Sequence, residues 1–532
     1  MEYGNMSENI VSVEENAQFS KSLLWKFQRD YFIGKGVNAW AQGDVPFYIT
    51  SNAFIAYGYA QTALRYLQDG LKAGTINPDH PIYMMEIGTG SGKFSFLFLK
   101  HMYDFLHQFK LNHLKFCYIM SDFTESNVGY WQQHPQFQKF LNAGMLDFAI
   151  FATGESTSIH LIKQNITLGE NSCVNPLIAV GNYLFDTIPS DLFRVSAGKL
   201  EEGLISLKTP KENLVNENTV HAPERVQVDF SYREINLPYY NNPAFDAVLS
   251  DYTHHLGDGN FLAPTSAIAC IDALRKISNN RLLIIGGDKA YSSMESMANL
   301  GAPHIAFHGS FSLMVNFDFI SRYFKNIGGD SLMPEDHEGF KICLFSLGQK
   351  FSELPETSWA YEHFTRHMST KEFLEIKNFL IKDISQLDLD SLLALLKFSY
   401  WDTDIFYSVV SQLANIINQA SPSYLRTLRQ GLKYIEENYY FIRSYKNVPF
   451  ELGHIYHLLG DLEEALLHYQ QSLDFFGAES PIHFNIGLCY YYKQDLPTAL
   501  GHFKKAVEFN PDNASAKEWI AYVEKELASK AV

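Results

Sequence analysis

The sequence predicts an α/β domain in roughly the first two-thirds of the chain and an all-helical segment after it. From Pro81 to about Leu347, short apolar runs alternate with amphipathic stretches, as in a parallel sheet with crossover helices. After Gly348 the strand signal stops and helical spacing continues. The end of the chain repeats itself with a period of 34 residues. At 532 residues the chain is also longer than one hydrophobic core usually supports, so we expect several domains.

The composition describes a folded protein with an acidic balance of charge. Apolar residues make up 46% of the chain, and 59 acidic against 42 basic residues give a formal net charge of −17. Because such a charge repels phosphate backbones and anionic lipid heads, we expect neither a nucleic-acid partner nor a membrane surface. The first 18 residues are polar and unlike a signal peptide, no apolar run is long enough to span a membrane, and the five cysteines are scattered. We therefore expect a cytoplasmic protein with reduced thiols.

Six short apolar runs with few charges predict the strands of a buried sheet. They lie at residues 82–87, 116–121, 146–152, 176–181, 281–286 and 340–346. A helix is expected at 94–109, between the first two strands. Residues 209–242 are rich in Glu, Asn and Pro, which favours hairpins or loops, so we expect an insertion at about 205–245. These assignments place the α/β domain at residues 1–348.

Two units near the end of the chain share six positions, each pair 34 residues apart. The first unit carries Leu452, Gly453, Tyr456, Ala465, Tyr469 and Ser472, and the second carries Ile486, Gly487, Tyr490, Ala499, Phe503 and Ala506. The small residues let paired helices approach closely, and Pro511 falls where a tetratricopeptide repeat ends its second helix. We predict such repeats at 446–532 with a capping helix at 514–528, preceded by a helical connector at 349–445. A plain pair of helical hairpins is the alternative.

A glycine-rich turn, E-I-G-T-G-S-G at residues 86–92, joins the first predicted strand to its helix. Gly88 and Gly90 lack the Cβ atoms that would keep a ligand away from the backbone, and Gly92 lets the helix start close to the strand. A dinucleotide site has the spacing G-x-G-x-x-G around a pyrophosphate, whereas here the spacing is G-x-G-x-G with Glu86 before it. A carboxylate suits an ammonium and a sulfonium and repels a pyrophosphate. We therefore favour S-adenosylmethionine as the ligand over a dinucleotide or an ordinary turn without a ligand.

Asp122 follows the second predicted strand. In a doubly wound sheet, ligands bind beyond the carboxyl ends of the strands, and an acid there can accept hydrogen bonds from both ribose hydroxyls. The alternative is a helix N-cap for the helix that starts near Glu125, and the two roles can coexist.

Three further segments resemble motifs of the MidA-like methyltransferases, a family that includes the mitochondrial complex I assembly methyltransferase. Residues 43–51 with 57–58 resemble the family's "GDF-x-T-S/A-P … F-G" motif. Residues 182–189 with Phe193 resemble its "N-E-x-x-D-A-L-P-x-x-x-F" segment, and residues 309–317 resemble "D-I-T-A-H-V-D-F". Together with the glycine turn and Asp122, the likeness covers roughly residues 20–347 in unbroken order.

The resemblance implies a Rossmann-like class I methyltransferase fold with insertions, and a protein substrate methylated on arginine or another nitrogen. On the matching positions it places the methyl donor against Gly43, Thr50, Glu86, Gly88, Gly90 and Asp122. It places Asn182 and Asp186 beside the methyl group and the acceptor. The chain departs from the family at residues 286–291, at Tyr183 and at 310–312, all on the acceptor side, so donor binding transfers better than arginine specificity.

Asp186 is our candidate to take the proton that a nitrogen acceptor must lose, and Asn182 is the amide that would orient the acceptor. A helix N-cap is the alternative role for Asp186. No metal is expected, because His254, His255, His304 and His308 have no cysteine or paired acid at ligand spacing.

Three functions remain open at this point. The first is methyl transfer to a protein side chain, with the repeats recruiting the protein. The second is an inactive methyltransferase-like scaffold whose repeats bind partners. The third is a small-molecule methyltransferase whose repeats mediate self-association.

Overall fold

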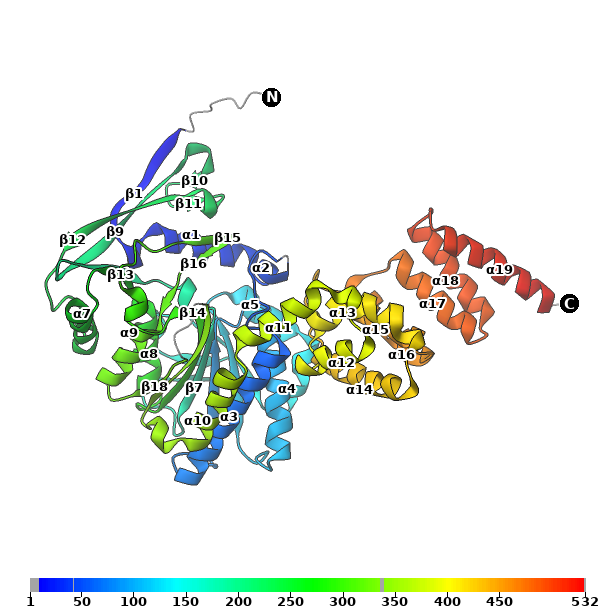
Figure 1. Ribbon diagram of the computed structural model, residues 1–532, viewed down its shortest axis with the longest axis horizontal. Coiled ribbons are helices and arrows are strands. Elements are labelled where there is room, and N and C mark those ends of the chain that lie inside the picture. Colours follow the sequence, from blue (N-terminus) through cyan, green and yellow to red (C-terminus); the bar gives the residue numbers. More distant parts are fainter. Residues whose placement is uncertain (1–8, 42, 335–338, 531–532) are drawn as a thin grey trace. The chain divides into compact units, whose positions relative to one another are not determined.

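The computed structural model describes residues 9–41, 43–334 and 339–530 (Figure 1). The first eight residues of the polar N-terminal stretch therefore lie outside the described part. By internal contacts the chain divides into two compact units, Met1–Ser51 with Ile55–Glu372 and Asn52–Phe54 with Phe373–Val532. No described helix has the length and apolar character needed to cross a bilayer.

The first unit is built on an eight-stranded mixed sheet. Its parallel strands run in the order β4, β3, β2, β7, β14, and β19 and β18 extend this order beyond β14, with β19 antiparallel to both neighbours. The bounds are β2 Ile82–Ile87, β3 Phe116–Asp122, β4 Leu146–Ile150, β7 Leu177–Asn182, β14 Leu282–Tyr291, β18 Asp330–Leu332 and β19 Phe340–Leu347, and the short β17 (Val315–Asn316) pairs with β14. All six predicted strands are confirmed. Numbered along the chain, the parallel strands have the Rossmann order 3-2-1-4-5, so the α/β prediction is confirmed as well.

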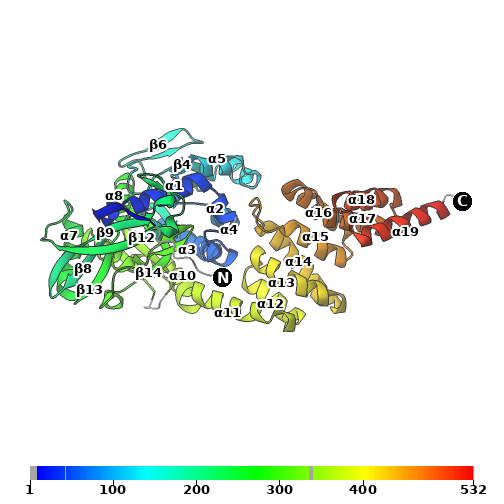
Figure 2. The same ribbon diagram turned by 90° about the horizontal axis from the view of Figure 1, so that it is seen from above.

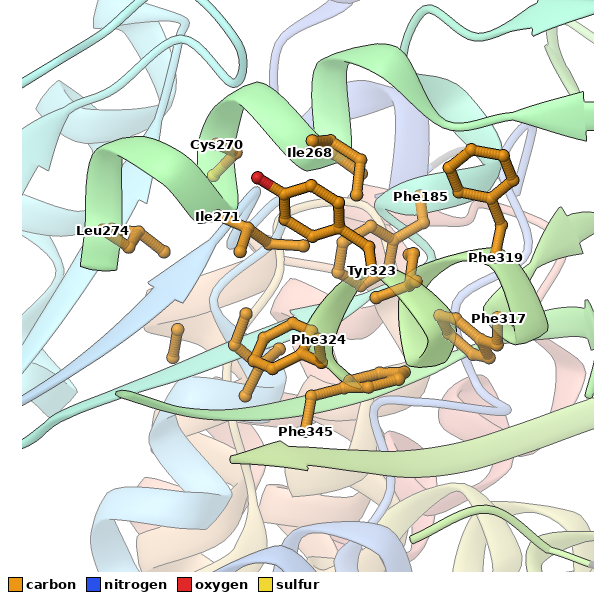
Figure 3. Packing of buried hydrophobic residues seen from close by; sticks show 14 of the residues in the cluster. Phe185, Ile268, Cys270, Ile271, Leu274, Phe317, Phe319, Tyr323, Phe324 and Phe345 are labelled. Atoms are coloured by element: carbon orange, nitrogen blue, oxygen red, sulfur yellow. The ribbon is translucent and has the colours of Figure 1, made fainter. Parts of the chain in front are cut away.

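Helices cover both faces of this sheet. On one face lie α8 (Thr265–Ile277) and α9 (Phe317–Asn326), and on the other lie α3 (Ala53–Ala73) and α4 (Lys93–Gln108) (Figures 1 and 2). Figure 3 shows how α9 fills the first face, where the rings of Phe317 and Phe324 lie 5.7 and 5.3 Å from the ring of Phe345 on β19. On the opposite face, Phe98 of α4 stacks on Tyr118 of β3 at 5.1 Å. With both faces covered, the strand ends are left as the place for a ligand.

A second, antiparallel sheet was not anticipated from the sequence. Its strands run in the order β1, β9, β8, β13, and β12 also pairs with β9. The bounds are β1 Ile10–Gln18, β8 Asp191–Ser196, β9 Lys199–Pro210, β12 Gln227–Glu234 and β13 Gly259–Ala263. The expected insertion at 205–245 supplies the end of β9, the hairpin of β10 (Leu214–Asn216) and β11 (Thr219–Val220), and β12. Phe19, Trp25 and Phe311 are among the residues of a separate small core beside this sheet.

The second unit is helical throughout its described residues. It contains α11 (Thr370–Lys382, whose first residues belong to the first unit), α12 (Leu389–Phe398), α13 (Thr403–Ile416), α14 (Pro422–Asn438), α15 (Val448–Leu458), α16 (Leu462–Phe476), α17 (Ser480–Tyr492), α18 (Leu496–Phe509) and α19 (Ala514–Lys530). A Cβ at Gly453 would lie 2.7 Å from the Tyr469 ring, and one at Gly487 would lie 2.6 Å from the Phe503 ring. The repeated glycines therefore permit the close helix contacts on which the repeat prediction depended.

Candidate functional site

A cavity of about 440 Å³ opens at the carboxyl ends of β2, β3 and β7. Of the residues singled out from the sequence, the cavity is lined by Thr50, Glu86, Gly88, Gly90, Asp122, Asn182 and Asp186. Gly43 and Gly92 do not line it. Gly43 is exposed in a turn with φ +81°, and Gly92 precedes α4 with φ +85°, so both fill positions in the left-handed region that favours glycine.

The glycine turn is held firmly against the neighbouring strand. Gly88 and Gly90 have φ of +71° and +61°, and the Thr89 amide donates a 2.9 Å hydrogen bond to the Ser121 carbonyl on β3. A Cβ at Gly90 would lie 2.9 Å from Cζ2 of Trp40. Both glycines are therefore required by backbone conformation, and at Gly90 there is also no room for a side chain.

Glu86 is buried at the end of β2 and accepts all its hydrogen bonds on one oxygen. Tyr118 donates to Oε2 at 2.9 Å, Thr89 Oγ1 donates at 3.3 Å, and Ser95 donates as well. Within the described chain, Oε1 receives no hydrogen bond. Burial raises the pKa of Glu86 to about 7, against the opposing effect of these donors. A cationic group beside Oε1 would favour the ionised carboxylate.

Asp122 ends β3 and is also buried. Its Oδ1 accepts hydrogen bonds from the Thr124 amide and hydroxyl, both at 2.9 Å, and Oδ2 accepts one from Asn127 Nδ2 at 3.1 Å. Burial raises its pKa. The N-cap of α5 (Glu125–Gln133) is Thr124, so Asp122 orients the residue at the cap without being the cap itself. Asn127 Oδ1 also faces this site, and it is buried without a hydrogen-bond partner.

Asn182 ends β7 with its amide oriented by a neighbouring tyrosine. Tyr59 Oη donates a 2.7 Å hydrogen bond to Asn182 Oδ1, while Asn182 Nδ2 is buried without a partner. The next residue, Tyr183, has φ +46°, a strained conformation for a residue with a side chain. The chain therefore turns sharply directly after Asn182, whose side-chain Nδ2 has no partner. Tyr59 was missed from the sequence, although it follows directly after the quoted Tyr57-Gly58 pair.

Asp186 lies in a buried 3-10 turn, Phe185–Thr187, whose N-cap is Leu184, so Asp186 is not a helix N-cap. Its Oδ1 is buried without a hydrogen-bond partner. Burial raises its pKa to about 7, and Lys289 opposes the shift. Asp288 Oδ2 accepts the amides of Phe185 and Asp186 at 3.0 and 3.2 Å, and burial beside Asp186 raises its own pKa well above the usual range. Asp288 therefore holds the turn that presents Asp186.

The N-terminal helix α1 (Leu23–Lys35) forms another wall of the cavity. Gln28 uses both ends of its amide, since Nε2 donates to the Thr187 carbonyl at 2.9 Å and Oε1 accepts the Phe311 amide at 2.9 Å. Arg29 forms a 2.8 Å ion pair with Glu155, on the loop after β4. Three segments that are distant in sequence therefore meet at this wall.

The histidines considered as metal ligands lie in different places. His308 lines the cavity and burial lowers its pKa, whereas His304 lines a separate cavity of about 200 Å³. His254 and His255 are exposed at the end of α7 (Pro243–His255). In the described chain, the group with the spacing of metal ligands is Glu436, Glu464 and His468 in the helical unit, and Lys433 Nζ already lies 2.9 Å from Glu464.

Comparison with known proteins bears mainly on the repeats. Residues 480–513 and 450–475 match models of the tetratricopeptide repeat family, which confirms the predicted repeats. No curated protein matches the sequence significantly.

Solved structures that match parts of the chain include the following three. Two come from Burkholderia thailandensis and belong to the COG1565 superfamily. One is an uncharacterised protein with 13% sequence identity and a TM-score of 0.36, and the match covers 62% of this chain and 87% of that protein. The other is a "likely methyl transferase" bound to S-adenosyl-homocysteine, with 14% identity and a TM-score of 0.37, and the match covers 62% of this chain and 92% of that protein. A tetratricopeptide repeat protein from Thermus thermophilus has 16% identity and a TM-score of 0.23, covering 32% of this chain and 91% of its own.

Proposed function

We propose that the first unit is an S-adenosylmethionine-dependent methyltransferase that acts on a protein side chain, with the repeats recruiting that protein. The observation that carries the proposal is the pairing of Glu86 and Asp122, two buried carboxylates at the ends of adjacent strands that line one cavity. Its volume of about 440 Å³ lies within the usual range for small-molecule sites, about 300–1,000 Å³. Glu86, directly before the glycine turn, suits a cationic ligand and opposes a pyrophosphate, and Asp122, at the end of the adjacent strand, suits the ribose hydroxyls of a nucleoside.

Different residues of the chain would hold the amino-acid end and the nucleoside of such a ligand. Glu86 Oε1 would accept the ammonium of the amino-acid end, and the Asp122 carboxylate would accept the ribose hydroxyls. Asn127 Oδ1, buried without a partner, offers an acceptor for a further donor of the ligand. When bound, such a donor would supply an electrophilic methyl group, and Asn182 at the end of β7 lines the same cavity.

On the side of the cavity where the methyl-accepting substrate would bind, two buried atoms have no hydrogen-bond partner. They are Asn182 Nδ2, which can donate a hydrogen bond, and Asp186 Oδ1, which can accept one. A nitrogen nucleophile carries both a lone pair and a proton, so it can be oriented by the amide and deprotonated by the carboxylate. A bound donor would supply an electrophilic methyl group to the nitrogen lone pair and would keep the electrons of its carbon–sulfur bond on sulfur, while Asp186 Oδ1 would take the proton that the nitrogen loses. A carboxyl with a pKa of about 7 is suited to this exchange near neutral pH.

A protein substrate is favoured by the repeats, because stacked helical hairpins of this type form extended surfaces that bind peptides. A scaffold without activity and a methyltransferase for small molecules are the competing outcomes. The arginine specificity implied by the MidA-like resemblance stays a prediction.

The test combines calorimetry with transfer of a labelled methyl group to lysate proteins, using the full chain. We expect Glu86→Gln to weaken donor binding strongly while leaving it measurable, and Asp186→Asn to keep binding while losing most transfer. Glu170→Gln, an exposed position in the same unit, is the control. If the unchanged chain binds no donor, the proposal is wrong and a scaffold role is favoured. If label reaches small metabolites in protease-treated lysate and no protein is labelled, the protein substrate is wrong.

A further inference from the structure

The cavity has an aromatic wall, and two of its rings already hold a cation. The Arg29 guanidinium lies 5.0 Å from the ring centre of Phe123, and Lys93 Nζ lies 5.9 Å from that of Phe47. The face of an aromatic ring attracts positive charge, and more strongly where water is excluded. The wall is therefore suited to cations, and its protein cations occupy two separate rings.

A second pair of rings on this wall, Phe32 and Trp40, holds no such cation. The two rings stack with their centres 5.7 Å apart and an angle of 22° between their planes. Both residues line the cavity and are half-buried, and no described side-chain cation lies over either ring. This pair is the part of the aromatic wall that a cationic ligand could still use.

Trp40 also lies directly against the glycine turn. A Cβ at Gly90 would approach Cζ2 of Trp40 to 2.9 Å, so the indole packs against the backbone at this glycine. From another side, Trp131 Nε1 donates a 3.2 Å hydrogen bond to the Gly90 carbonyl. The turn that carries Glu86 at its start is thus held with an aromatic ring beside it and a carboxylate before it.

We propose that Trp40, supported by Phe32, is a specificity-determining residue that distinguishes the sulfonium of S-adenosylmethionine from the neutral sulfur of S-adenosylhomocysteine. This inference rests on the proposed function. The two molecules carry the same ammonium and the same adenosine, so the hydrogen bonds that Glu86 and Asp122 would accept are the same for both. They differ in the methyl group and in the charge on sulfur, and an electron-rich ring face responds to that charge. Weaker binding of the product would favour its release after transfer.

The test is calorimetric titration of the full chain with each molecule separately. We expect Trp40→Leu to weaken S-adenosylmethionine binding about three- to tenfold more than S-adenosylhomocysteine binding. Trp40→Phe keeps a ring and should retain part of the preference, which also covers the case in which the leucine variant fails to fold. Trp359→Leu is the control, because Trp359 is 55% exposed on α10 (Pro355–Glu362) and does not line the cavity.

Two results would overturn the inference while leaving the proposed function intact. Equal weakening for both molecules would mean that the ring stacks on the shared adenosine. Tighter binding of both by Trp40→Leu would mean that the indole obstructs the cavity. If the unchanged chain binds neither molecule, the proposed function fails and this inference fails with it.

Discussion

Tyr59 Oη donates a 2.7 Å hydrogen bond to Asn182 Oδ1, and this bond determines which end of the amide is left for a ligand. Because the oxygen is occupied, Asn182 presents Nδ2, a buried donor without a partner. A buried hydrogen-bond donor without a partner is unfavourable unless a ligand forms a hydrogen bond with it. The two residues come from α3 and from the end of β7, so the helix positions an atom of the strand.

Replacing Tyr59 with phenylalanine should impair methyl transfer more than donor binding. Loss of the bond leaves the Asn182 amide free to rotate, and a neutral hydrogen bond contributes about 1 kcal/mol, or roughly a fivefold effect. We expect kcat to fall by about that factor, with the donor Kd unchanged. Tyr66→Phe on the same helix is the matched control, since Tyr66 is buried and does not line the cavity. An equal loss of kcat in both variants would contradict the role of Tyr59.

Donor binding should weaken as the pH falls through 7. Burial raises the pKa of Glu86 to about 7, and a cationic ligand requires the ionised form. Protonation of Glu86 reduces the ionised, binding-competent fraction about eightfold between pH 7.5 and 6. The pH dependence that comes from titration of the ligand is the same for Glu86→Gln in the same buffers, so the difference between the two proteins reports on Glu86. A wild-type affinity that follows the variant's pH profile would show that Glu86 does not contact the cation.

The same carboxyl should make the ligand-free protein less stable as the pH rises. The folded pKa of about 7 exceeds the ordinary value of 4.5, so the folded state holds the proton that the unfolded state releases. The associated stability is present below pH 4.5 and is lost as the pH rises through 7. Glu86→Gln carries no such charge, so its advantage over wild type should grow between pH 5 and 8 by up to about 3 kcal/mol.

Chemical unfolding of both proteins at the two pH values measures this difference. Asp186 and Asp288 also have raised pKa values, but they are present in both proteins and cancel, whereas Asp122 interacts with Glu86 and contributes to the same difference. A constant difference between the variants at pH 5 and 8 would refute the assignment.

Two glycines in the last repeat should respond in opposite directions to alanine. A Cβ at Gly487 would lie 2.6 Å from the Phe503 ring, so Gly487→Ala should destabilise the repeats by about 1–3 kcal/mol. Gly501 is exposed on α18 with nothing within 4 Å of its Cβ position, so Gly501→Ala should stabilise by about 0.5–1 kcal/mol. Thermal unfolding followed by circular dichroism decides, and destabilisation by both changes would contradict the packing described.

The main sheet and the repeats could be predicted because their signals are local. Each of the six predicted strands is an apolar run bounded by polar turns, whereas the short β17 and β18 are not, and the repeat positions recur along the sequence itself. The second sheet has no such signal. Its strand β1 reads I-V-S-V-E-E-N-A-Q, with two register shifts against β9, and β13 joins from about 250 residues later. Only the tertiary structure brings these segments together.

The residues of the candidate site likewise include some with a local sequence signal and some that only the tertiary structure brings together. Glu86 and Asp122 lie at the carboxyl ends of β2 and β3, so their place at the sheet edge follows from the sequence. Tyr59 and Trp40 enter the site from helical segments, and their role depends on packing that no short motif records. Asp288 stood in a loosely matching segment, but its part in holding the turn at Asp186 depends on the pairing of β7 with β14.

Gln28 joins the carbonyl of Thr187 to the amide of Phe311 through a single side chain, and this has a consequence for how the cavity is made during synthesis. The first of these residues leaves the ribosome nearly 300 positions before the last. A nascent chain that has not yet reached Phe311 cannot complete the wall, even with the glycine turn and its acids already translated. The wall that Gln28 joins is therefore complete only in chains whose α/β unit is almost fully synthesised.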